Sequence, residues 1–426
     1  MRRFCATRLF VVLSLGCLVF PERHELPGLI PFRKGDLWGF CDRDKHIVIQ
    51  PQYEYLLPFN EGLALAGLNG KYGYIDTLGN TAVQFIYDDA GVFIDSAARV
   101  NFQGYYGFIN RNGDEFVPTI YENTGLFNGK VLAVRYNNKW GLIDRITKTI
   151  IPLKYDDIWD FREGMAKVKI GKKYGYVNQE GKEVVPVVYD DAADQFIDSL
   201  AWVKLNGKYG FVANNGRIVA RIRYDTVESF SEGLATVDSA GKYGFINNKG
   251  KRIIPLKYKS ALTFSESLAA VQTGSCWGFI DASGKSMIKA EYDAVGSFHG
   301  GRAKVLMEGK YGFIDRHGKL IILPKYTDAS NFMNGFAIVV SDSLFGLIDR
   351  QGNETIPMKY DFVSLVFDGL VQVRIDDKYG FVDTTGMPVI PIKYESVAVP
   401  FRGLIPVLLN GKRGFIDIKG VEYFEE

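Results

Sequence analysis

One ten-residue phrase, KYGFIDRHGK at Lys310 to Lys319, constrains what this chain can fold into. Its central glycine recurs with a step of 34 residues, and with a single step of 35, at Gly39, Gly73, Gly107, Gly141, Gly175, Gly210, Gly244, Gly278, Gly312, Gly346, Gly380 and Gly414. A fixed period of this length is typical of repeat proteins, in which each unit packs mainly on its neighbours. The sequence therefore predicts an array of twelve units over residues 28–426 with a truncated last unit, in place of separate globular domains.

Each unit is predicted to contain three β-strands. In the first strand, apolar and charged residues alternate, as at Arg302 to Met307, which is the period of a strand. A turn such as Asn410-Gly411 follows, and Asn-Gly between two apolar runs strongly indicates a hairpin. The phrase itself is apolar on both faces, as expected of a central strand. The third strand carries pairs such as Ile390-Pro391, and proline lacks a ladder donor, so this strand is expected at an edge.

Three further residues recur in register and are interpreted as structural. A Tyr ends the third strand, as at Tyr258, and a Phe stands in the connector, as at Phe264. A sugar-binding ladder is the alternative, but a 34-residue unit cannot bury its own apolar face and needs shared aromatic residues. An Asp precedes a Gly by three positions, as in Asp281 and Gly284, which is type I turn chemistry. Asn247 replaces this Asp in one unit, and a turn tolerates that exchange better than a catalytic or calcium-binding site would.

The predicted fold is all-β, with the units stacked as an open β-superhelix or solenoid. Propeller-like closure is the alternative, and it is less favoured because propellers have about four to eight blades of about 40 to 45 residues. The last unit ends at Glu426 without an Ile-Pro pair or the Tyr, and Arg413 replaces the aromatic residue before its glycine. Both features predict a polar terminal cap.

Aromatic-Gly pairs complete a recognisable pattern. Lys139-Trp140-Gly141, Cys276-Trp277-Gly278 and Leu37-Trp38-Gly39, together with the many Lys-Tyr-Gly copies, resemble the bacterial WG (KWG-type) repeat family over about residues 28–426. That family supplies no catalytic residues to carry over. More loosely, the chain resembles the aromatic-Gly hairpin repeats of bacterial cell-wall-binding modules, which implies an open β-superhelix and an envelope ligand.

The N-terminal segment, residues 1–20, is predicted to be a signal peptide. Arg2, Arg3 and Arg8 form a positive segment before a twelve-residue apolar run, Leu9 to Phe20, which is too short to span a bilayer. The run LSLGC looks like a lipoprotein signal with Cys17 as the lipidated residue, and ordinary secretion is the alternative. We therefore expect export to the bacterial cell envelope (periplasm, outer surface or secreted), with membrane attachment only through an N-terminal lipid.

The sequence shows no recognisable motif for catalysis, for a cofactor or for nucleic-acid binding. The four His residues fall at unrelated repeat positions without zinc-ligand spacing, and no nucleophile set or nucleotide-binding glycine motif stands out. Without the three arginines of the predicted signal peptide, 48 of the 51 basic residues remain against 49 acidic residues, which gives a formal net charge of −1. Nucleic acid would call for a basic domain or stripe. The sequence thus predicts no enzyme activity, no cofactor and no nucleic-acid partner.

Residues that break the repeat pattern are the candidates for ligand binding, because packing already explains the pattern itself. Trp159 and Trp202 lie outside the phrase, beside the only length change and near Arg221 and Arg223. Aromatic residues near arginine can anchor a sugar or a protein partner, whereas the alternative is that they cover local apolar surface. The resulting hypothesis is a non-enzymatic exported scaffold that binds an unknown protein or glycan of the envelope. A structural spacer lipoprotein without a ligand and an enzyme with an unrecognised site are the alternatives.

Overall fold

The computed structural model describes residues 26–127, 130–145, 150–364 and 368–425. The predicted signal peptide, residues 1–20, and its Cys17 lie outside these residues, so both remain predictions. In the described part of the chain, no helix is long and apolar enough to cross a membrane. We number the units one to twelve in the order of their motif glycines, from Gly39 to Gly414.

Each unit begins with the two strands of a hairpin. The first strands are β1(Ile30–Lys34), β5(Ala64–Leu68), β9(Ala98–Phe102), β13(Val131–Tyr136), β17(Met165–Ile170), β21(Leu200–Leu205), β25(Leu234–Ser239), β29(Ala269–Thr273), β33(Ala303–Met307), β37(Phe336–Ser341), β41(Leu370–Ile375) and β45(Leu404–Leu409). The second strands hold the motif glycines and are β2(Leu37–Cys41), β6(Lys71–Ile75), β10(Tyr105–Ile109), β14(Lys139–Asp144), β18(Lys173–Asn178), β22(Lys208–Ala213), β26(Lys242–Asn247), β30(Cys276–Ile280), β34(Lys310–Ile314), β38(Leu344–Asp349), β42(Lys378–Asp383) and β46(Lys412–Asp417).

The third strand follows the Asp turn, and a strand of two residues begins the connector. The third strands are β3(Ile47–Tyr53), β7(Thr81–Tyr87), β11(Glu115–Tyr121), β15(Ile150–Tyr155), β19(Glu183–Tyr189), β23(Ile218–Tyr224), β27(Arg252–Tyr258), β31(Ser286–Tyr292), β35(Leu320–Tyr326), β39(Glu354–Tyr360) and β43(Pro388–Tyr394). The short strands are β4(Tyr55–Leu56), β8(Asp89–Ala90), β12(Asn123–Thr124), β16(Asp157–Ile158), β20(Asp191–Ala192), β24(Thr226–Val227), β28(Ser260–Ala261), β32(Ala294–Val295), β36(Asp328–Ala329), β40(Phe362–Val363) and β44(Ser396–Val397).

The short strands add a fourth strand to the three that the sequence predicts. Each pairs antiparallel with the first strand of the following unit, so that a typical sheet has the order β4-β5-β6-β7. The connector forms this strand because its backbone continues the hydrogen bonding of the sheet, with Glu54 N donating to Gly67 O and Leu57 N to Leu65 O. The connector therefore binds each unit to the next through backbone hydrogen bonds as well as through its Phe.

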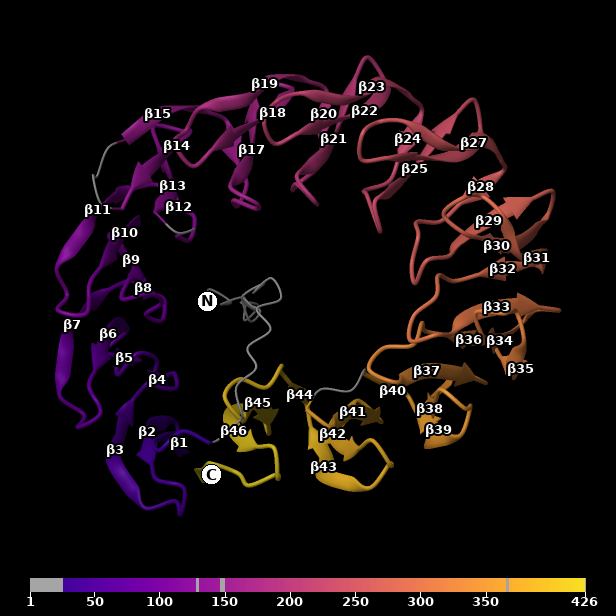
Figure 1. Cartoon of the computed structure of the whole chain (residues 1–426). Helices are drawn as coiled ribbons and strands as arrows, with labels where there is room; N and C mark the ends of the chain where they lie inside the picture. The colour runs from indigo at the N-terminus through magenta and orange to yellow at the C-terminus, as the bar shows by residue number, and fades with distance from the viewer. Residues whose placement is uncertain (1–25, 128–129, 146–149, 365–367, 426) are drawn as a thin grey trace, which may run out of the picture.

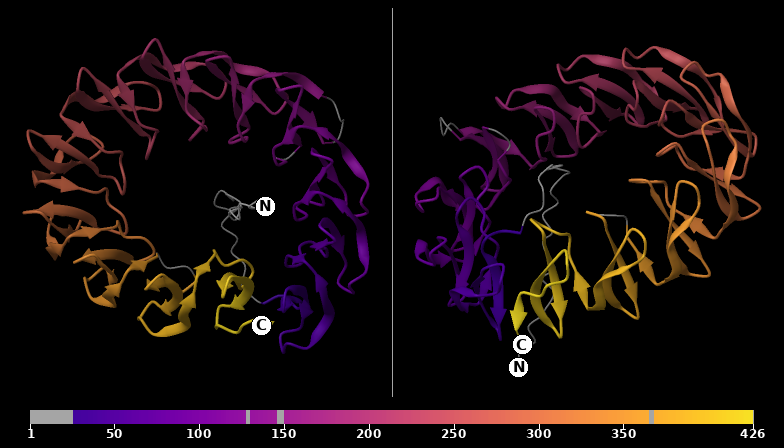
Figure 2. Two further views of the ribbon diagram at one scale, coloured as in Figure 1. Left: turned by 180° about the vertical axis from the view of Figure 1, so that it is seen from behind. Right: turned by 60° about the horizontal axis from the view of Figure 1, so that its bottom comes forward.

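The twelve sheets are arranged in a ring (Figure 1). The short strands lie toward the middle of the ring and the third strands lie at its outer wall, which confirms the third strand as an edge strand. Two further views show the same arrangement, with the first and last units side by side (Figure 2). Buried clusters run from one sheet to the next, and they contain the repeated Tyr and Phe residues, such as Tyr258 and Phe264. The interpretation of these two rows as core is confirmed.

The last unit closes the ring on the first. The strand β47(Phe424–Glu425) pairs parallel with β1, at the place that a short strand holds in the other sheets. Tyr423, Phe415 and Leu404 share a buried cluster with Trp38 and its neighbours. The rings of Trp38 and Phe415 meet edge to face at 5.7 Å between centroids.

Side chains reinforce this seam. Lys412 pairs with Asp36 at 3.0 Å, and Arg33 Nε donates to Arg413 O at 2.6 Å. Arg402 donates to Phe59 O at 3.0 Å and to Asn60 Oδ1 at 2.6 Å, which joins the connectors that precede units twelve and two.

The all-β array of twelve units is therefore confirmed, and of the two expected arrangements the molecule adopts the propeller-like closure. An open β-superhelix would leave the apolar faces of Trp38 and Phe415 exposed to water, whereas the ring buries them against each other. The prediction of a polar cap at the last unit is wrong for the same reason. Its residues Tyr423 and Phe424 bind the first unit and do not face solvent as a polar end.

Two repeated residues have clear structural causes. A Cβ atom added to Gly312 would lie 2.5 Å from Ile322 O, because the third strand bulges across the second at this point. The motif glycine is thus required for close backbone approach. In the turn, Asp315 Oδ1 accepts hydrogen bonds from the backbone N–H groups of His317 and Lys319, both at 2.9 Å. This confirms the interpretation of the Asp row as turn residues.

Candidate functional site

Five units cover the tyrosine that precedes the motif glycine with a positive charge from their own first strand. Arg99 lies over Tyr106 at 3.9 Å, Lys204 over Tyr209 at 5.0 Å and Lys304 over Tyr311 at 5.2 Å from the ring centroids. These cations come from the first strand of the same unit. A cation over an aromatic face is attracted by the negative face of the ring, so these tyrosines already have a partner.

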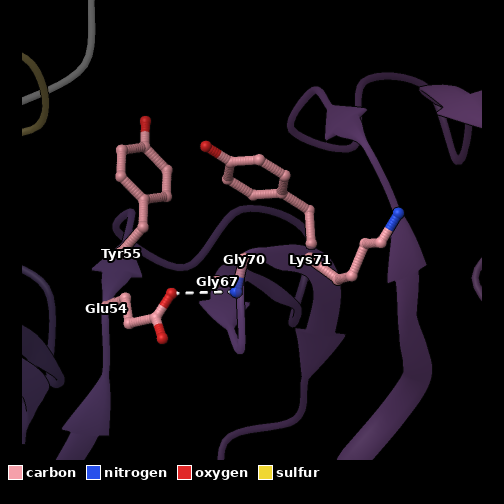
Figure 3. Close-up of a pocket in the computed structure, with 6 residues that line it drawn as sticks. Glu54, Tyr55, Gly67, Gly70 and Lys71 are labelled. Carbon is pink, nitrogen blue, oxygen red and sulfur yellow. Dashed lines mark hydrogen bonds between the residues drawn. The ribbon is translucent and has the colours of Figure 1, made fainter. Parts of the chain in front are cut away.

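Unit two departs from this arrangement and contains a shallow recess with a volume of about 230 Å³. It is lined by Glu54, Tyr55, Gly67, Gly70, Lys71 and Tyr72. The rings of Tyr55 and Tyr72 stand edge to face at 5.6 Å. Figure 3 shows the Tyr55 side chain rising from its strand above Glu54. Glu54 lies at its rim, where its Oε2 atom accepts a hydrogen bond from Gly70 N at 3.0 Å.

The recess exists because one residue of unit two, Gly67, and one residue of the connector before it, Tyr55, differ from their counterparts in the neighbouring units. Gly67 pairs with Tyr55 across β4 and β5, and a Cβ atom on Gly67 would lie 2.9 Å from the Cβ atom of Tyr55. A side chain at position 67 would therefore occupy the space beside the two rings. Burial raises the pKa of Tyr55 to about 12, although the positive charge of Arg413 acts in the opposite direction. The Tyr55 hydroxyl is thus neutral at ordinary pH.

The two predicted tryptophans lie in adjacent units, and both are half-buried. Trp159 directly follows β16, the short strand that pairs with the first strand of unit five, and its backbone N–H donates to Lys167 O at 3.0 Å. Trp202 is on the first strand of unit six, edge to face with Tyr209 at 5.5 Å. It also packs against the buried clusters on both sides of its sheet, so part of its ring belongs to the inter-unit packing.

Lys167 connects the two tryptophan-bearing segments. Its ammonium group is buried and lies 5.0 Å from the Trp159 ring and 4.7 Å from the Tyr174 ring. It donates to Ala192 O at 2.6 Å and to Asp194 Oδ1 at 3.1 Å. Ala193, between these two residues, donates to Trp202 O at 2.9 Å. The Trp159 ring thus contacts Lys167, and Trp202 adjoins this group through its backbone carbonyl. We call Trp159, Lys167, Tyr174 and Trp202 the tryptophan cluster.

The predicted arginines do not join this cluster. Arg221 and Arg223 are exposed on β23, the outer strand, and β22 separates that strand from β21, which carries Trp202. Arg223 instead lies over Tyr224 at 5.2 Å and donates to the Tyr224 hydroxyl at 3.2 Å. The structure thus places Trp159 and Trp202 at inner strands of adjacent sheets, whereas the two arginines lie on the outer edge strand.

One group of side chains in the described residues has donor atoms close enough to hold a metal ion. Asp42, Asp44 and His46 offer ligand atoms within 4.8 Å of one another. However, Asp42 Oδ1 already accepts the N–H groups of Asp44 and His46, which is the turn seen in the other units. A metal ion would have only one ligand atom from each of these three residues, which are exposed or half-buried. We therefore assign no metal site to them.

The recess of unit two was missed by sequence reasoning, which looked for additional tryptophans. A signal was nevertheless available. Tyr55 stands where the other short strands begin with a residue such as Asp89, Asn123 or Ser260, and Gly67 is the only glycine at its position of the first strand.

A family model described as "WG containing repeat" matches eleven consecutive segments between residues 38 and 412. No curated protein matches the chain.

Among solved structures, a eukaryotic initiation factor is 12% identical with a TM-score of 0.38, covering 69% of this chain and 94% of its own. The extracellular domain of a protein described as a hybrid two component system of B. thetaiotaomicron is 10% identical, with a TM-score of 0.26 and coverage of 92% and 74%. PorZ, a bacterial surface component of the type-IX secretion system of Porphyromonas gingivalis, is 9% identical, with a TM-score of 0.24 and coverage of 85% and 64%. Likenesses this distant carry no information on function.

Proposed function

Because the chain belongs to the WG repeat family, whose repeated residues are explained here by packing, we propose that its function resides in the residues that depart from the repeat. The protein is a non-enzymatic exported scaffold, and it binds a protein or glycan partner of the bacterial cell envelope. The observation that supports this proposal is the tryptophan cluster, in which two half-exposed indoles from adjacent units lie on the inner strands of the ring.

Physical chemistry favours this cluster as a binding surface. Indoles and tyrosines provide large, rigid contact areas that suit both sugar rings and protein anchors. Lys167 is held by Asp194 and Ala192 O, so the aromatic side chains around it have little freedom to lose on binding. No set of residues resembling a nucleophile, base and oxyanion donor accompanies the cluster in the described residues.

The proposal is tested by capture from envelope fractions with the full chain as bait. Detergent-extracted envelope proteins and purified peptidoglycan are incubated separately with the wild type, with Trp159→Ala and with Tyr105→Ala. Tyr105 is an exposed aromatic residue of unit three and serves as the matched control. We expect one fraction to be retained by the wild type and by Tyr105→Ala, and retention to fall several-fold in Trp159→Ala.

The remaining outcomes separate the alternatives. If neither fraction is retained by the wild type, the protein is a spacer without a specific ligand. If retention is equal in Trp159→Ala, the binding surface lies elsewhere on the ring. Intact-mass measurement tests export separately: the mature chain starts after Gly16 if Cys17 is lipidated or near Phe20 if it is not, and a cellular protein that begins at Met1 would contradict both.

A further inference from the structure

The recess of unit two has a filled counterpart in unit eleven of the same chain. Arg374 pairs with Phe362 across β40 and β41, as Gly67 pairs with Tyr55 across β4 and β5. The Cζ atom of Arg374 lies 6.0 Å from the centroid of Phe362 and 5.8 Å from that of Tyr379. Both units therefore have two aromatic rings around one strand position. In unit eleven a guanidinium group stands beside them, and in unit two that position has no side chain.

In two other units a cation at the same strand position lies over the tyrosine that precedes the motif glycine. Lys169 lies over Tyr174 at 5.5 Å in unit five, and Lys204 lies over Tyr209 at 5.0 Å in unit six. The geometry of the hairpin thus delivers a positive charge from this position to the tyrosine before the motif glycine. Gly67 leaves that place open beside Tyr72, and Tyr55 adds a second aromatic wall. Two rings around a cation are the arrangement that recognises organic cations.

The charges around the recess also favour a cation. The carboxylate of Glu54 is at the rim, and it accepts only the hairpin N–H of Gly70 among its described hydrogen bonds. The ammonium group of Lys71 is paired with Asp88 and points away from Tyr55 (Figure 3). The charges of Asp89 and Arg413 also act on the Tyr55 hydroxyl: Asp89 raises its pKa and Arg413 lowers it. Formally, Glu54, Asp88 and Asp89 against Lys71 and Arg413 give a balance of −1.

We propose that the recess formed by Glu54, Tyr55, Gly67 and Tyr72 binds the guanidinium group of an arginine side chain presented by a protein partner. The group occupies the place that Arg374 fills in unit eleven. The Tyr72 ring receives it as Tyr379 receives Arg374, and Glu54 provides the opposite charge. This site lies in a different part of the ring from the tryptophan cluster, so either site can fail its test without affecting the other.

The test uses saturation-transfer NMR on the full chain with two small probes. One is Nα-acetyl-arginine methylamide, and the other is Nα-acetyl-citrulline methylamide, which has nearly the same shape without the charge. We expect a weak, fast-exchanging complex with the arginine probe and at least a five-fold weaker signal with the citrulline probe. Glu54→Gln removes one exposed charge but keeps a hydrogen-bond acceptor, and it should weaken binding about five-fold.

A variant that fills the recess from within gives the sharpest result. Gly67→Arg reproduces the residue of unit eleven and should abolish binding of the arginine probe. Gln272→Arg is the matched control, because it adds the same charge at the same strand position of unit eight, and it should leave binding unchanged. Equal binding of both probes, or undiminished binding in a folded Gly67→Arg, would overturn the proposal. If Gly67→Arg does not fold, undiminished binding in Glu54→Gln would overturn it instead.

Discussion

Removal of the Tyr423 side chain is expected to open the ring at its seam. Tyr423 is 1% exposed and packs in the cluster that joins the first and last units. Truncating a buried aromatic side chain to alanine costs about 3–5 kcal/mol. The strand β47 is only two residues long, and its side-chain contacts with the first unit, Lys34 with Glu425 and Arg33 over Phe424, are with charged groups. The two backbone bonds at the seam, from Arg33 N to Tyr423 O and from Gly35 N to Glu425 O, should therefore be lost with the Tyr423 side chain. Tyr423→Ala should therefore separate unit twelve from unit one without unfolding the other units.

Hydrogen exchange measured by mass spectrometry gives the direct readout. A cost of about 3 kcal/mol corresponds to an opening equilibrium roughly a hundred-fold larger, so peptides that cover β1 should exchange about a hundred-fold faster. Peptides from unit seven should be unchanged. Small-angle scattering should show a larger radius of gyration for the opened ring.

Tyr105→Ala provides the control, since this tyrosine is 49% exposed in a hairpin of unit three. It should change exchange at β1 by less than two-fold, as expected for a surface substitution costing under about 0.5 kcal/mol. If Tyr423→Ala left exchange at β1 and the radius of gyration as in the wild type, the reasoning would be refuted. The seam would then depend on Arg402 and Lys412 and not on the apolar cluster.

Three further predictions concern the repeated residues. Gly312→Ala should destabilise unit nine by about 1–3 kcal/mol in urea unfolding, because the new Cβ atom would lie 2.5 Å from Ile322 O, and a neutral result would contradict the need for close approach. Phe264→Ala should lower the free energy of unfolding by about 3–5 kcal/mol. Asp281→Asn should lower it by less than about 0.5 kcal/mol, because Asn still accepts the backbone N–H groups of Ser283 and Lys285. The reverse order would make the Asp row a candidate ligand set. In the folded state, hydrogen bonds lower the pKa of the turn carboxyls, chiefly the bond from the Ser283 side chain to Asp281 and the bond from the Thr385 side chain to Asp383. The stability that these carboxyls contribute is therefore present above their unfolded pKa, near 4, and is lost as the pH falls below it. A melting temperature that stays constant from pH 5 to pH 2.5 would exclude this linkage.

The units were predictable from the sequence, but the way in which they close was not. Alternation, Asn-Gly turns and the Ile-Pro pairs act within one unit, and they correctly indicate its three long strands. The curvature of the array depends on small rotations between sheets, and no single residue encodes them. Closure depends on contacts between Trp38 and Phe415, which are separated by almost the whole chain.

The candidate site was likewise predictable only in part, because the sequence shows which residues break the repeat but not how the strands place them. Trp159 and Trp202 were found because they break the repeat, and the structure places them in one cluster. Their association with Arg221 and Arg223 was inferred from proximity in the sequence, which fails across the strands of a sheet. The recess of unit two depends on the absence of a side chain at Gly67 beside Tyr55, a combination that becomes apparent only when β4 and β5 are paired.

The position of the third strands at the outer wall has a consequence for how these molecules behave when crowded. The wall is a succession of edge strands, and exposed edges invite pairing between molecules that ends in aggregation. At the middle of these strands the chain repeatedly carries an exposed proline, such as Pro118, Pro186, Pro255, Pro357 and Pro391. Proline offers no N–H group to an incoming strand, and the exposed charges of Arg221 and Lys289 stand at the same position in two units that lack it. The outer wall can therefore pass close to its copies without forming a continuous sheet with them.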